Sequence, residues 1–368
     1  MVLWLNLAGW VTETIKSYDR MDSRNLIVSK FPNLHKKRKG EDYEMAAIEV
    51  KELSKTFKVK IKEKGLRGSV KSIFKPTYKI IEAVKDISFK VDEGEILAFI
   101  GPNGAGKSTT IKMLTGILYP GTGEISCLNM NPTEKRKSLS YKIGTVFGQK
   151  EQLWMHLTPY DNFKFFGAIY DLAEAEIEER IEELSETFQL NDFINTPVRN
   201  LSLGQRIRCE IVASLIHRPQ ILFLDEPTIG LDPVVKENIR QLIKQMNKEY
   251  KTTIFLTSHD IGDIEKLCKR IIIVNHGRIV LDDSMAKIKS NYLNKKIIEV
   301  KLKNNMGFVP EEGISLIKNK GDILKFEVDT TKRRIHDVLK EIEGDNIIDI
   351  TISDIPLEQI ITQIYKSR

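Results

Sequence analysis

The sequence has little cysteine and no long apolar run, and both absences narrow the kinds of protein it can encode. Its 368 residues include three cysteines, Cys127, Cys209 and Cys268, which form no close pair and leave an odd number. A disulfide-stapled secreted domain is therefore excluded, and a reducing cytoplasm fits best. No stretch reaches the roughly 18 consecutive apolar residues of a membrane-spanning helix. We expect a chain that is soluble or peripheral to a membrane, and the apolar residues 2–11 lack the flanks of a signal peptide.

Charge is plentiful but unevenly spread. The formal net charge is +6, yet the segment from Lys51 to Lys79 holds ten Lys or Arg against two Glu, a net charge of +8. Such a run can face anionic lipid headgroups, at about 1 kcal/mol per basic residue near the surface. It can equally be a solvated loop. Both interpretations stay open.

The order of the apolar patterns predicts an α/β fold made of an N-terminal extension and two domains. Residues 1–45 show no sustained period, and we expect a poorly ordered extension. Residues 46–283 predict the first domain, a mixed sheet core and an antiparallel β subdomain with a helical insertion at about 150–216. Its predicted strands cover 47–53, 87–91, 95–100, 221–224, 253–257, 271–274 and 278–281. Residues 284–368 predict a small α+β domain, with strands at 296–302, 323–328 and 347–352 and helices at 332–342 and near 360–364.

A glycine-rich loop follows the predicted strand at 95–100 and opens a helix that begins near Thr109. Its residues are Gly101, Pro102, Asn103, Gly104, Ala105, Gly106, Lys107 and Ser108, which match the pattern GxxxxGK[ST] in the context that this pattern needs. Glycine lets backbone N–H groups close around phosphate oxygens, and the helix N-terminus adds partial positive charge. We expect Lys107 to bind the β- and γ-phosphates of ATP, and Ser108 to bind Mg²⁺.

Two carboxylates follow a second apolar strand. Residues 221–224 are Ile-Leu-Phe-Leu, and Asp225 and Glu226 come directly after them. A strand that ends in this way delivers both carboxylates to the phosphate site. We expect Asp225 to hold Mg²⁺ and Glu226 to act as the general base that polarises the attacking water.

Between these two motifs lies the pentapeptide Leu201-Ser202-Leu203-Gly204-Gln205. A Ser-x-Gly-Gln element upstream of an acidic strand end resembles the signature of the nucleotide-binding subunit of ABC transporters. The resemblance covers roughly residues 46–283. It departs from the family pattern at Leu203, where the usual residue is Gly, and this departure bears on the hydrolysis rate more than on the mechanism.

The resemblance implies further site residues. His259, at the end of the strand after Glu226, matches the switch histidine that contacts the γ-phosphate. Gln149 matches the Q-loop glutamine that senses Mg²⁺ and the attacking water. Ser202, Gly204 and Gln205 are implied to face ATP held by a second copy, and residues 230–232 match the D-loop, which contacts that copy.

Two assignments rest on aromatic residues. The family pattern selects Phe57 as the ring that stacks on adenine, but Tyr78 lies closer in sequence to the phosphate loop, so both stay candidates. The segment after Gln149 carries Leu153 and the rings Trp154, Phe163, Phe165 and Phe166. We expect at least one of them to contact a membrane subunit, and core packing to explain others.

The basic insertion after Phe57, the Q-loop, the signature and the C-terminal module together resemble the ATPase subunits of ABC-2-type exporters. This resemblance implies an ATPase at the cytoplasmic face of the membrane that uses ATP and Mg²⁺. Its implied partners are ABC-2-type permease subunits and a second copy of itself, and no nucleic acid is expected. A soluble ABC ATPase that acts on ribosomes or DNA is the alternative, although the chain has one domain set and no heptad run. An importer ATPase is a second alternative.

Overall fold

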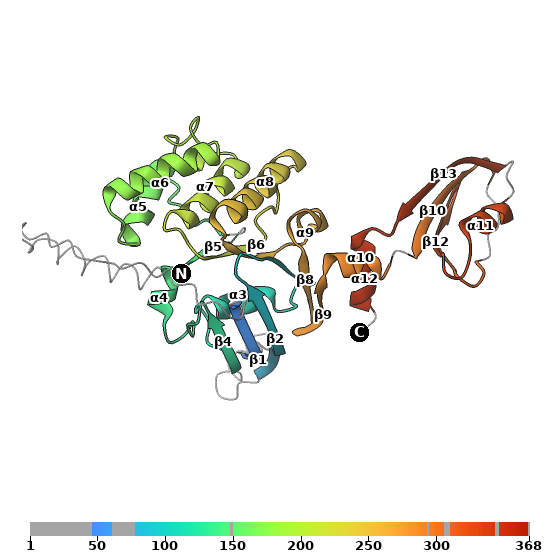
Figure 1. Ribbon diagram of the computed structural model, residues 1–368, viewed down its shortest axis with the longest axis horizontal. Helices are drawn as coiled ribbons and strands as arrows, with labels where there is room; N and C mark the ends of the chain where they lie inside the picture. Colours follow the sequence, from blue (N-terminus) through green and yellow to red (C-terminus); the bar gives the residue numbers. More distant parts are fainter. Residues whose placement is uncertain are drawn as a thin grey trace, which may run out of the picture. The chain divides into compact units, whose positions relative to one another are not determined.

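A computed structural model describes residues 46–60, 78–147, 150–292, 294–304, 310–342 and 346–366 (Figure 1). Three predictions lie outside these residues. They are the N-terminal extension at 1–45, the Q-loop residue Gln149, and the part of the basic run at 61–77. Among the described residues, no helix combines the length and apolar character needed to span a bilayer.

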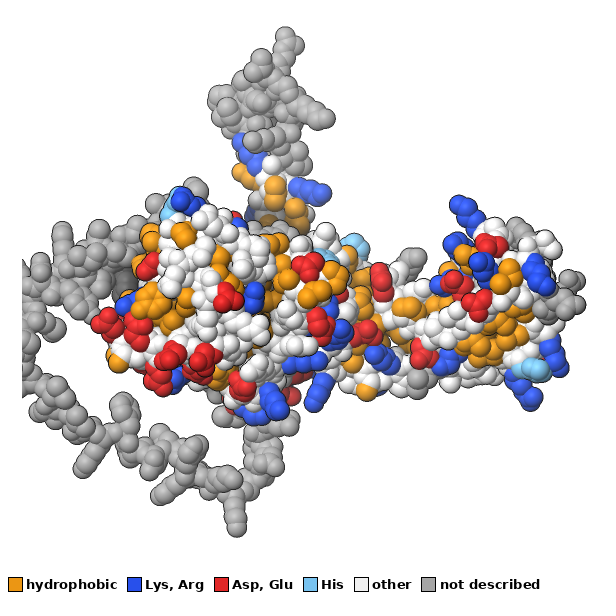
Figure 2. Space-filling view, turned by 90° about the horizontal axis from the view of Figure 1, so that it is seen from above, with side chains coloured by type: hydrophobic (Ala, Val, Ile, Leu, Met, Phe, Trp, Pro, Cys, Tyr) orange, Lys and Arg blue, Asp and Glu red, His pale blue; other side chains and the backbone are white. Residues whose placement is uncertain are grey.

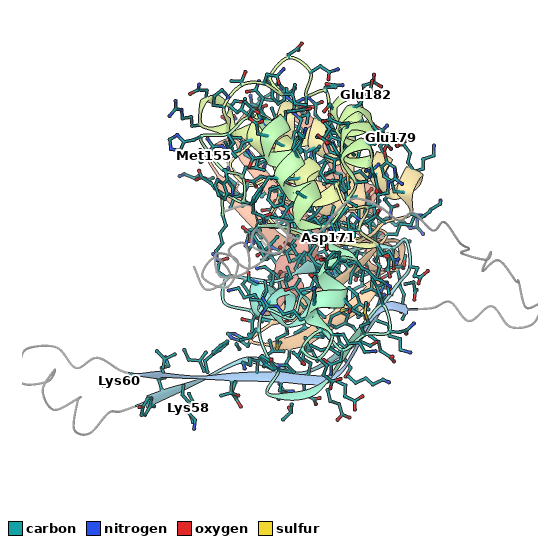
Figure 3. The ribbon with its side chains drawn as sticks, turned by 90° about the vertical axis from the view of Figure 1, so that its left-hand side faces the viewer. Lys58, Lys60, Met155, Asp171, Glu179 and Glu182 are labelled. Carbon is teal, nitrogen blue, oxygen red and sulfur yellow. The ribbon has the colours of Figure 1, made fainter. Side chains whose placement is uncertain are left out.

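An antiparallel sheet is formed by β1 (Ala46–Lys60), β2 (Tyr78–Asp92) and β4 (Thr122–Cys127), in the order β2-β1-β4. The alternation that predicted a strand at 47–53 is present, with Ile48 and Val50 buried. The outer ends of β1 and β2 continue as an exposed two-stranded ribbon, on which Lys58 pairs with Ile80 and Lys60 with Tyr78. Figure 3 shows this ribbon, with Lys58 and Lys60 labelled, projecting from the rest of the domain.

The second sheet has the strand order β5-β6-β7-β3-β8-β9, in which all neighbours are parallel except β8 and β9. Its strands are β3 (Ile96–Ile100), β5 (Ile143–Phe147), β6 (Ile221–Asp225), β7 (Thr253–Thr257), β8 (Arg270–Asn275) and β9 (Arg278–Ser284). The central strands are apolar and buried along their length because helices cover both faces of a parallel sheet. The associated helices are α3 (Lys107–Leu114), α4 (Arg136–Ser140), α8 (Pro233–Tyr250) and α9 (Ile261–Leu267).

The predicted helical insertion consists of α5 (Pro159–Ile169), α6 (Glu174–Thr187), the short 3-10 helix η1 (Val198–Asn200) and α7 (Leu203–Leu215) (Figure 1). Helix α6 buries Ile177, Ile181 and Leu184 at helical spacing. Its glutamates line the opposite side, where Figure 3 labels Glu179 and Glu182. The amphipathic pattern predicted this helix correctly.

The C-terminal region contains a four-stranded antiparallel sheet in the order β11-β12-β10-β13. Its elements are α10 (Met285–Ser290), β10 (Lys295–Leu302), β11 (Ile314–Lys320), β12 (Ile323–Asp329), α11 (Ile335–Glu341), β13 (Ile347–Asp354) and α12 (Leu357–Lys366). The sheet and α11 have their own core, which includes Val300, Phe326 and Val338. In contrast, Ile360 and Ile361 of α12 belong to the same core as Ile264 of α9. The domain boundary at residue 284 stays a prediction.

The helix predicted at 332–342 is wrong at its start. Helix α11 begins at Ile335, because the preceding residues form a turn closed by Asp329. The backbone N–H groups of Lys332 and Arg333 both donate to the carbonyl oxygen of Asp329 at 3.0 Å. The Asp329 carboxylate also accepts the backbone N–H of Thr331 at 3.0 Å. This Asx-type turn satisfies backbone groups that a longer helix would otherwise use.

Candidate active site

The glycine-rich loop lies between β3 and α3, as predicted. Gly106 is the N-cap of α3 with φ 107°, in the left-handed region that favours glycine. A Cβ on Gly106 would lie 2.4 Å from the carbonyl oxygen of Ala83, and one on Gly101 would lie 2.2 Å from that of Val274. Pro102, Asn103 and Gly104 are exposed on the loop, while Ala105 is buried. The backbone is therefore packed so closely that only glycine fits at its two ends.

Lys107 lies inside this loop. Its Nζ donates to the carbonyl oxygens of Gly101 at 2.6 Å and Pro102 at 3.3 Å. Burial lowers the pKa of the ammonium group, and the nearby carboxylates of Glu226 and Asp225 partly oppose that effect. The side chain is thus a buried cation held against carbonyl oxygens, at the place where the motif predicts phosphate oxygens.

Asp225 and Ser108 meet at the edge of the sheet. The Ser108 hydroxyl donates to Oδ2 of Asp225 at 3.2 Å, and the Thr257 hydroxyl donates to Oδ1 at 2.5 Å. The contact arises because β6 pairs with β7 and β7 with β3, so the carboxyl ends of these parallel strands lie side by side. Thr109 follows Ser108 in the first turn of α3. The structure therefore brings together Ser108 and Asp225, two of the three side chains predicted to bind Mg²⁺.

The donor set at this point suits Mg²⁺. Among the described residues no three His, Cys, Asp or Glu side chains gather into a metal site, so an all-protein cage is not present there. A hydroxyl and one carboxylate are hard oxygen donors, and Mg²⁺ is commonly bound by one or two such groups together with substrate phosphates. Ser108 and Asp225 fit that role.

Glu226 and His259 form a second pair beside the first. Nε2 of His259 lies 2.7 Å from Oε1 of Glu226. The Glu226 backbone has φ 58°, which is unusual for a residue with a side chain, and its N–H donates to the carbonyl oxygen of Thr257 at 3.0 Å. This arrangement turns the chain out of β6 and directs the carboxylate toward the end of β7. Backbone conformations of this kind concentrate at functional sites.

The signature residues begin α7. Ser202 is the N-cap, and its hydroxyl accepts the backbone N–H of Gln205 at 3.3 Å. The Gln205 side chain accepts the Ser202 N–H at 2.9 Å, which completes a capping box. Gly204 is buried, and a Cβ there would lie 2.6 Å from Cγ1 of Val235 in α8. In this chain, Gln205 has a local structural role in fixing the start of the helix.

Leu203, the departure from the family pattern, is the first residue of α7 and is 44% exposed. Its Cδ2 lies beside Gly230, where an added Cβ would be 3.4 Å away. Gly230 has φ 75° and belongs to the segment matched to the D-loop. Two segments that the family places at the contact with a second copy are therefore packed against each other within one chain.

Strand register separates the two aromatic candidates for adenine binding. Phe57 pairs with Ile81, and Tyr78 pairs with Lys60 further along the ribbon. Ala83, whose carbonyl oxygen lies against Gly106, is two residues beyond Ile81 and five beyond Tyr78. At about 3.4 Å per residue, the Phe57 pair is about 7 Å along the strand from Ala83, and Tyr78 is about 17 Å away. Phe57 is half-buried while Tyr78 is exposed, so the geometry favours Phe57.

Two residues that organise the site, Thr257 and Asp263, were not predicted from the sequence. Thr257 donates to Asp225, and it was identified only as part of the strand that precedes His259. Asp263, in α9, accepts hydrogen bonds from Ser258, Thr228 and Arg240. Asp263 could have been noticed, since it stands between Ile261 and Ile264 on a short helix that follows His259. An acidic residue on such a helix needs buried partners.

Known proteins share this arrangement of sheet, loop and helices. The family model described as ABC transporter matches residues 84–229. The chain is 34% identical over 207 residues to the ABC transporter ATP-binding protein NatA of Bacillus subtilis, a match that covers 56% of this chain and 84% of NatA. It is 38% identical over 207 residues to a fluoroquinolones export ATP-binding protein of Mycobacterium tuberculosis, covering 56% of this chain and 67% of that protein.

A solved structure agrees with these relatives. The dimeric post-hydrolysis structure of an ATP-binding cassette bound to ADP and Pi has a TM-score of 0.54 and 28% identity, over 65% of this chain and 98% of that one. The predicted α/β cassette fold and the predicted ATPase activity are confirmed. This chain belongs to the ABC transporter family and is an ATP-binding subunit that hydrolyses ATP.

Proposed function

We propose that the chain is the ATPase subunit of an ABC-2-type exporter and acts on separate permease subunits at the cytoplasmic face of the membrane. The observation that carries this proposal is the meeting of Lys107, Ser108, Asp225, Glu226 and His259 around one phosphate-binding loop. Export is supported by relatives named for it, including the fluoroquinolones export protein and the Linearmycin resistance ATP-binding protein LnrL of Bacillus subtilis.

In this proposal, the loop residues and Lys107 bind the phosphates of ATP. Ser108, Asp225 and Gln149 would hold Mg²⁺, which would neutralise phosphate charge. Glu226 accepts a proton from water as the water oxygen bonds to the γ-phosphorus, and the bond from that phosphorus to the leaving oxygen of ADP breaks. His259, whose Nε2 lies 2.7 Å from Oε1 of Glu226, contacts the γ-phosphate and holds the carboxylate in place.

We further propose that two copies form an ATP-sandwich dimer. Ser202 and Gly204 stand at the N-terminus of α7, where the backbone N–H groups of the first turn and the helix dipole favour an anion. Around them, Leu203, Ile229 and Val234 are large apolar side chains that the monomer leaves exposed. Exposed apolar side chains beside a polar anion site are expected on a surface that becomes buried when a second copy binds. The matched cassette structure bound to ADP and Pi is itself dimeric.

The permease contact is assigned to one part of the aromatic segment. Phe163 is fully buried and Leu153 nearly so, which makes them core residues. Trp154 is 42% exposed, and its ring centroid is 5.1 Å from that of half-buried Phe165. Aromatic pairs of this kind are enriched at protein interfaces. We assign Trp154 and Phe165 to the surface that binds the membrane subunit.

The surface of the insertion disfavours the alternative of a nucleic-acid partner. Helix α6 carries seven glutamates, and Figure 2 shows acidic side chains gathered along one side of the described surface. Such a surface repels the phosphates of RNA or DNA. The exposed lysines on the β1–β2 ribbon have the opposite sign, and their two interpretations, lipid contact or solvated ribbon, both remain predictions.

A substitution of Glu226 tests this function. Glu226→Gln keeps the shape of the side chain but cannot accept the proton, so we expect ATP binding to persist and hydrolysis to fall by about 10²–10⁴-fold. Size-exclusion chromatography of the full chain with ATP should then show a trapped dimer. A Glu226→Gln variant that hydrolyses ATP normally and stays monomeric would refute the model. Co-purification with ribosomes or DNA instead of a membrane subunit would support the alternative.

A further inference from the structure

Asp263 is a fully buried carboxylate that joins three separate segments of the chain. Its Oδ1 accepts a hydrogen bond from Nε of Arg240 in α8 at 2.6 Å. Its Oδ2 accepts from the Ser258 hydroxyl at 2.8 Å and also from the Thr228 hydroxyl. Thr228 and Ser258 are buried as well. Burying a charge is costly unless it is paired and hydrogen-bonded, and both oxygens of Asp263 meet that condition.

The partners of Asp263 adjoin the proposed catalytic pair. Thr228 follows Glu226 by two residues, and Ser258 directly precedes His259. A single oxygen atom, Oδ2 of Asp263, therefore accepts hydrogen bonds from two segments. One is the turn that follows β6, through Thr228, and the other is the start of the segment that follows β7, through Ser258. These are the two segments that place Glu226 and His259 within 2.7 Å of each other.

The rest of the network fixes Asp263 itself. Arg240 also approaches Asp260 at 3.3 Å and Glu237 at 3.3 Å, and Lys236 approaches Asp260 at 2.6 Å. Asp260 caps α9 by accepting the N–H of Gly262 at 2.8 Å. Helix α8 thus holds the start of α9 in place through two acidic residues. These hydrogen bonds of Asp263, Arg240 and Asp260 do not involve the phosphate loop, whose Ser108 donates to Asp225 instead.

We propose that Asp263 is a positioning residue for ATP hydrolysis. It fixes the relative placement of Glu226 and His259 without touching the nucleotide, so its loss lowers kcat and leaves ATP binding intact. A misplacement of about 1 Å in a catalytic constellation can cost on the order of 100-fold in rate. The inference rests on the proposed catalytic roles of Glu226 and His259.

The test uses shape-preserving substitutions in the full chain. Asp263→Asn replaces an oxygen acceptor by an amide donor that faces other donors, and Thr228→Val removes one hydroxyl without changing the shape of the side chain. We expect each variant to lower kcat by about 10–100-fold while the KM for ATP stays within about twofold. Thr228→Ser keeps the hydroxyl and should retain nearly wild-type kcat. Glu265→Gln, on the same helix but paired with Lys289 at 3.0 Å, is the matched control.

A double variant tests whether Asp263 and Thr228 act through their shared hydrogen bond, and normalised rates separate an effect on catalysis from an effect on folding stability. The double variant Asp263→Asn/Thr228→Val should be no slower than Asp263→Asn alone, because both changes break the same hydrogen bond. All rates are measured well below the melting temperature of each variant and are normalised to the fraction that binds ATP. A normal kcat in Asp263→Asn, or a loss that only follows the loss of ATP-binding protein, overturns the inference. If Glu226→Gln is active, the proposed function itself fails; if only Asp263→Asn is normal, the inference alone fails.

Discussion

Nε2 of His259 lies 2.7 Å from Oε1 of Glu226, across the boundary between the ends of β7 and β6. The His259 side chain is about two-fifths exposed, so the pair is open to the water and phosphate that the reaction needs. Such partly exposed contacts between an imidazole and a carboxylate contribute little to folding, typically about 0–1 kcal/mol. The contact is therefore expected to matter for chemistry and not for stability.

The first prediction follows from this difference. His259→Ala should lower kcat by about 10²–10⁴-fold, because the Glu226 carboxylate loses its imidazole neighbour and the site loses the proposed γ-phosphate contact. Thermal unfolding should change by less than about 3 °C, as expected for an exposed pair worth under about 1 kcal/mol. Steady-state ATPase assays and differential scanning fluorimetry measure both. A large fall in melting temperature with normal kcat would contradict the assignment.

Glu210 gives the second prediction, which concerns pH. It lies on α7 and is almost fully buried. Burial raises the pKa of Glu210 to about 7. The hydrogen bond from the backbone N–H of Gln152 and the positive charge of Arg206 lower this pKa, but their combined effect is smaller than that of burial. The folded state thus favours the protonated carboxyl of Glu210. The stabilisation of the fold that comes from this protonated form is fully present below about pH 4.5 and is lost as the pH rises through 7.

Glu210→Gln removes this dependence while keeping an oxygen for the Gln152 N–H. We expect the variant to melt roughly 2–5 °C above the wild type at pH 8 and close to it at pH 5. Glu179→Gln, on the exposed side of α6, serves as the control and should show no such difference. An equal gap between Glu210→Gln and wild type at both pH values would mean that the effect comes from packing and not from ionisation.

The third prediction separates the two aromatic candidates. Phe57→Ala should weaken ATP affinity by about 5- to 100-fold, the equivalent of about 1–3 kcal/mol of base stacking. Tyr78→Ala should change affinity by less than about twofold, because strand register places it further out on the ribbon. Titration with a fluorescent ATP analogue compares the two variants. The opposite order of effects would show that the ribbon does not hold the register described for Phe57 and Ile81.

The parts of the site predicted from sequence are those that a short segment encodes. The phosphate loop and the strand before Asp225 combine residue type, spacing and an adjacent apolar strand, so each carries its own structural context. Thr257 and Asp263 were missed because their roles depend on partners 32 and 35 residues away, Asp225 and Thr228. Such contacts arise from the pairing of β6 with β7, which no local pattern specifies.

Strand β11 and helix α10, two of the elements that were not predicted from the sequence, lack a clear hydrophobic period. Strand β11 has one buried residue, Ile314, followed by exposed ones, so its sequence shows no alternation. Helix α10 spans only six residues, fewer than two turns, which is too short for a helical pattern. Both are held by their neighbours: β11 pairs with β12, and Ser284 caps α10 by accepting the N–H of Lys287 at 3.2 Å.

The last prediction concerns Leu203, where this chain departs from the family signature. Its side chain packs beside Gly230 and leaves 44% of its surface exposed, next to exposed Ile229. If a second copy covers this surface, Leu203 contributes buried apolar area to the dimer, roughly 1 kcal/mol for half a leucine side chain. Leu203→Gly should therefore weaken ATP-driven dimerisation about fivefold, as measured by analytical ultracentrifugation in the Glu226→Gln background. Leu203→Met, which keeps the apolar bulk, should dimerise like the parent. Tighter dimerisation of Leu203→Gly would show instead that the leucine holds the two copies apart.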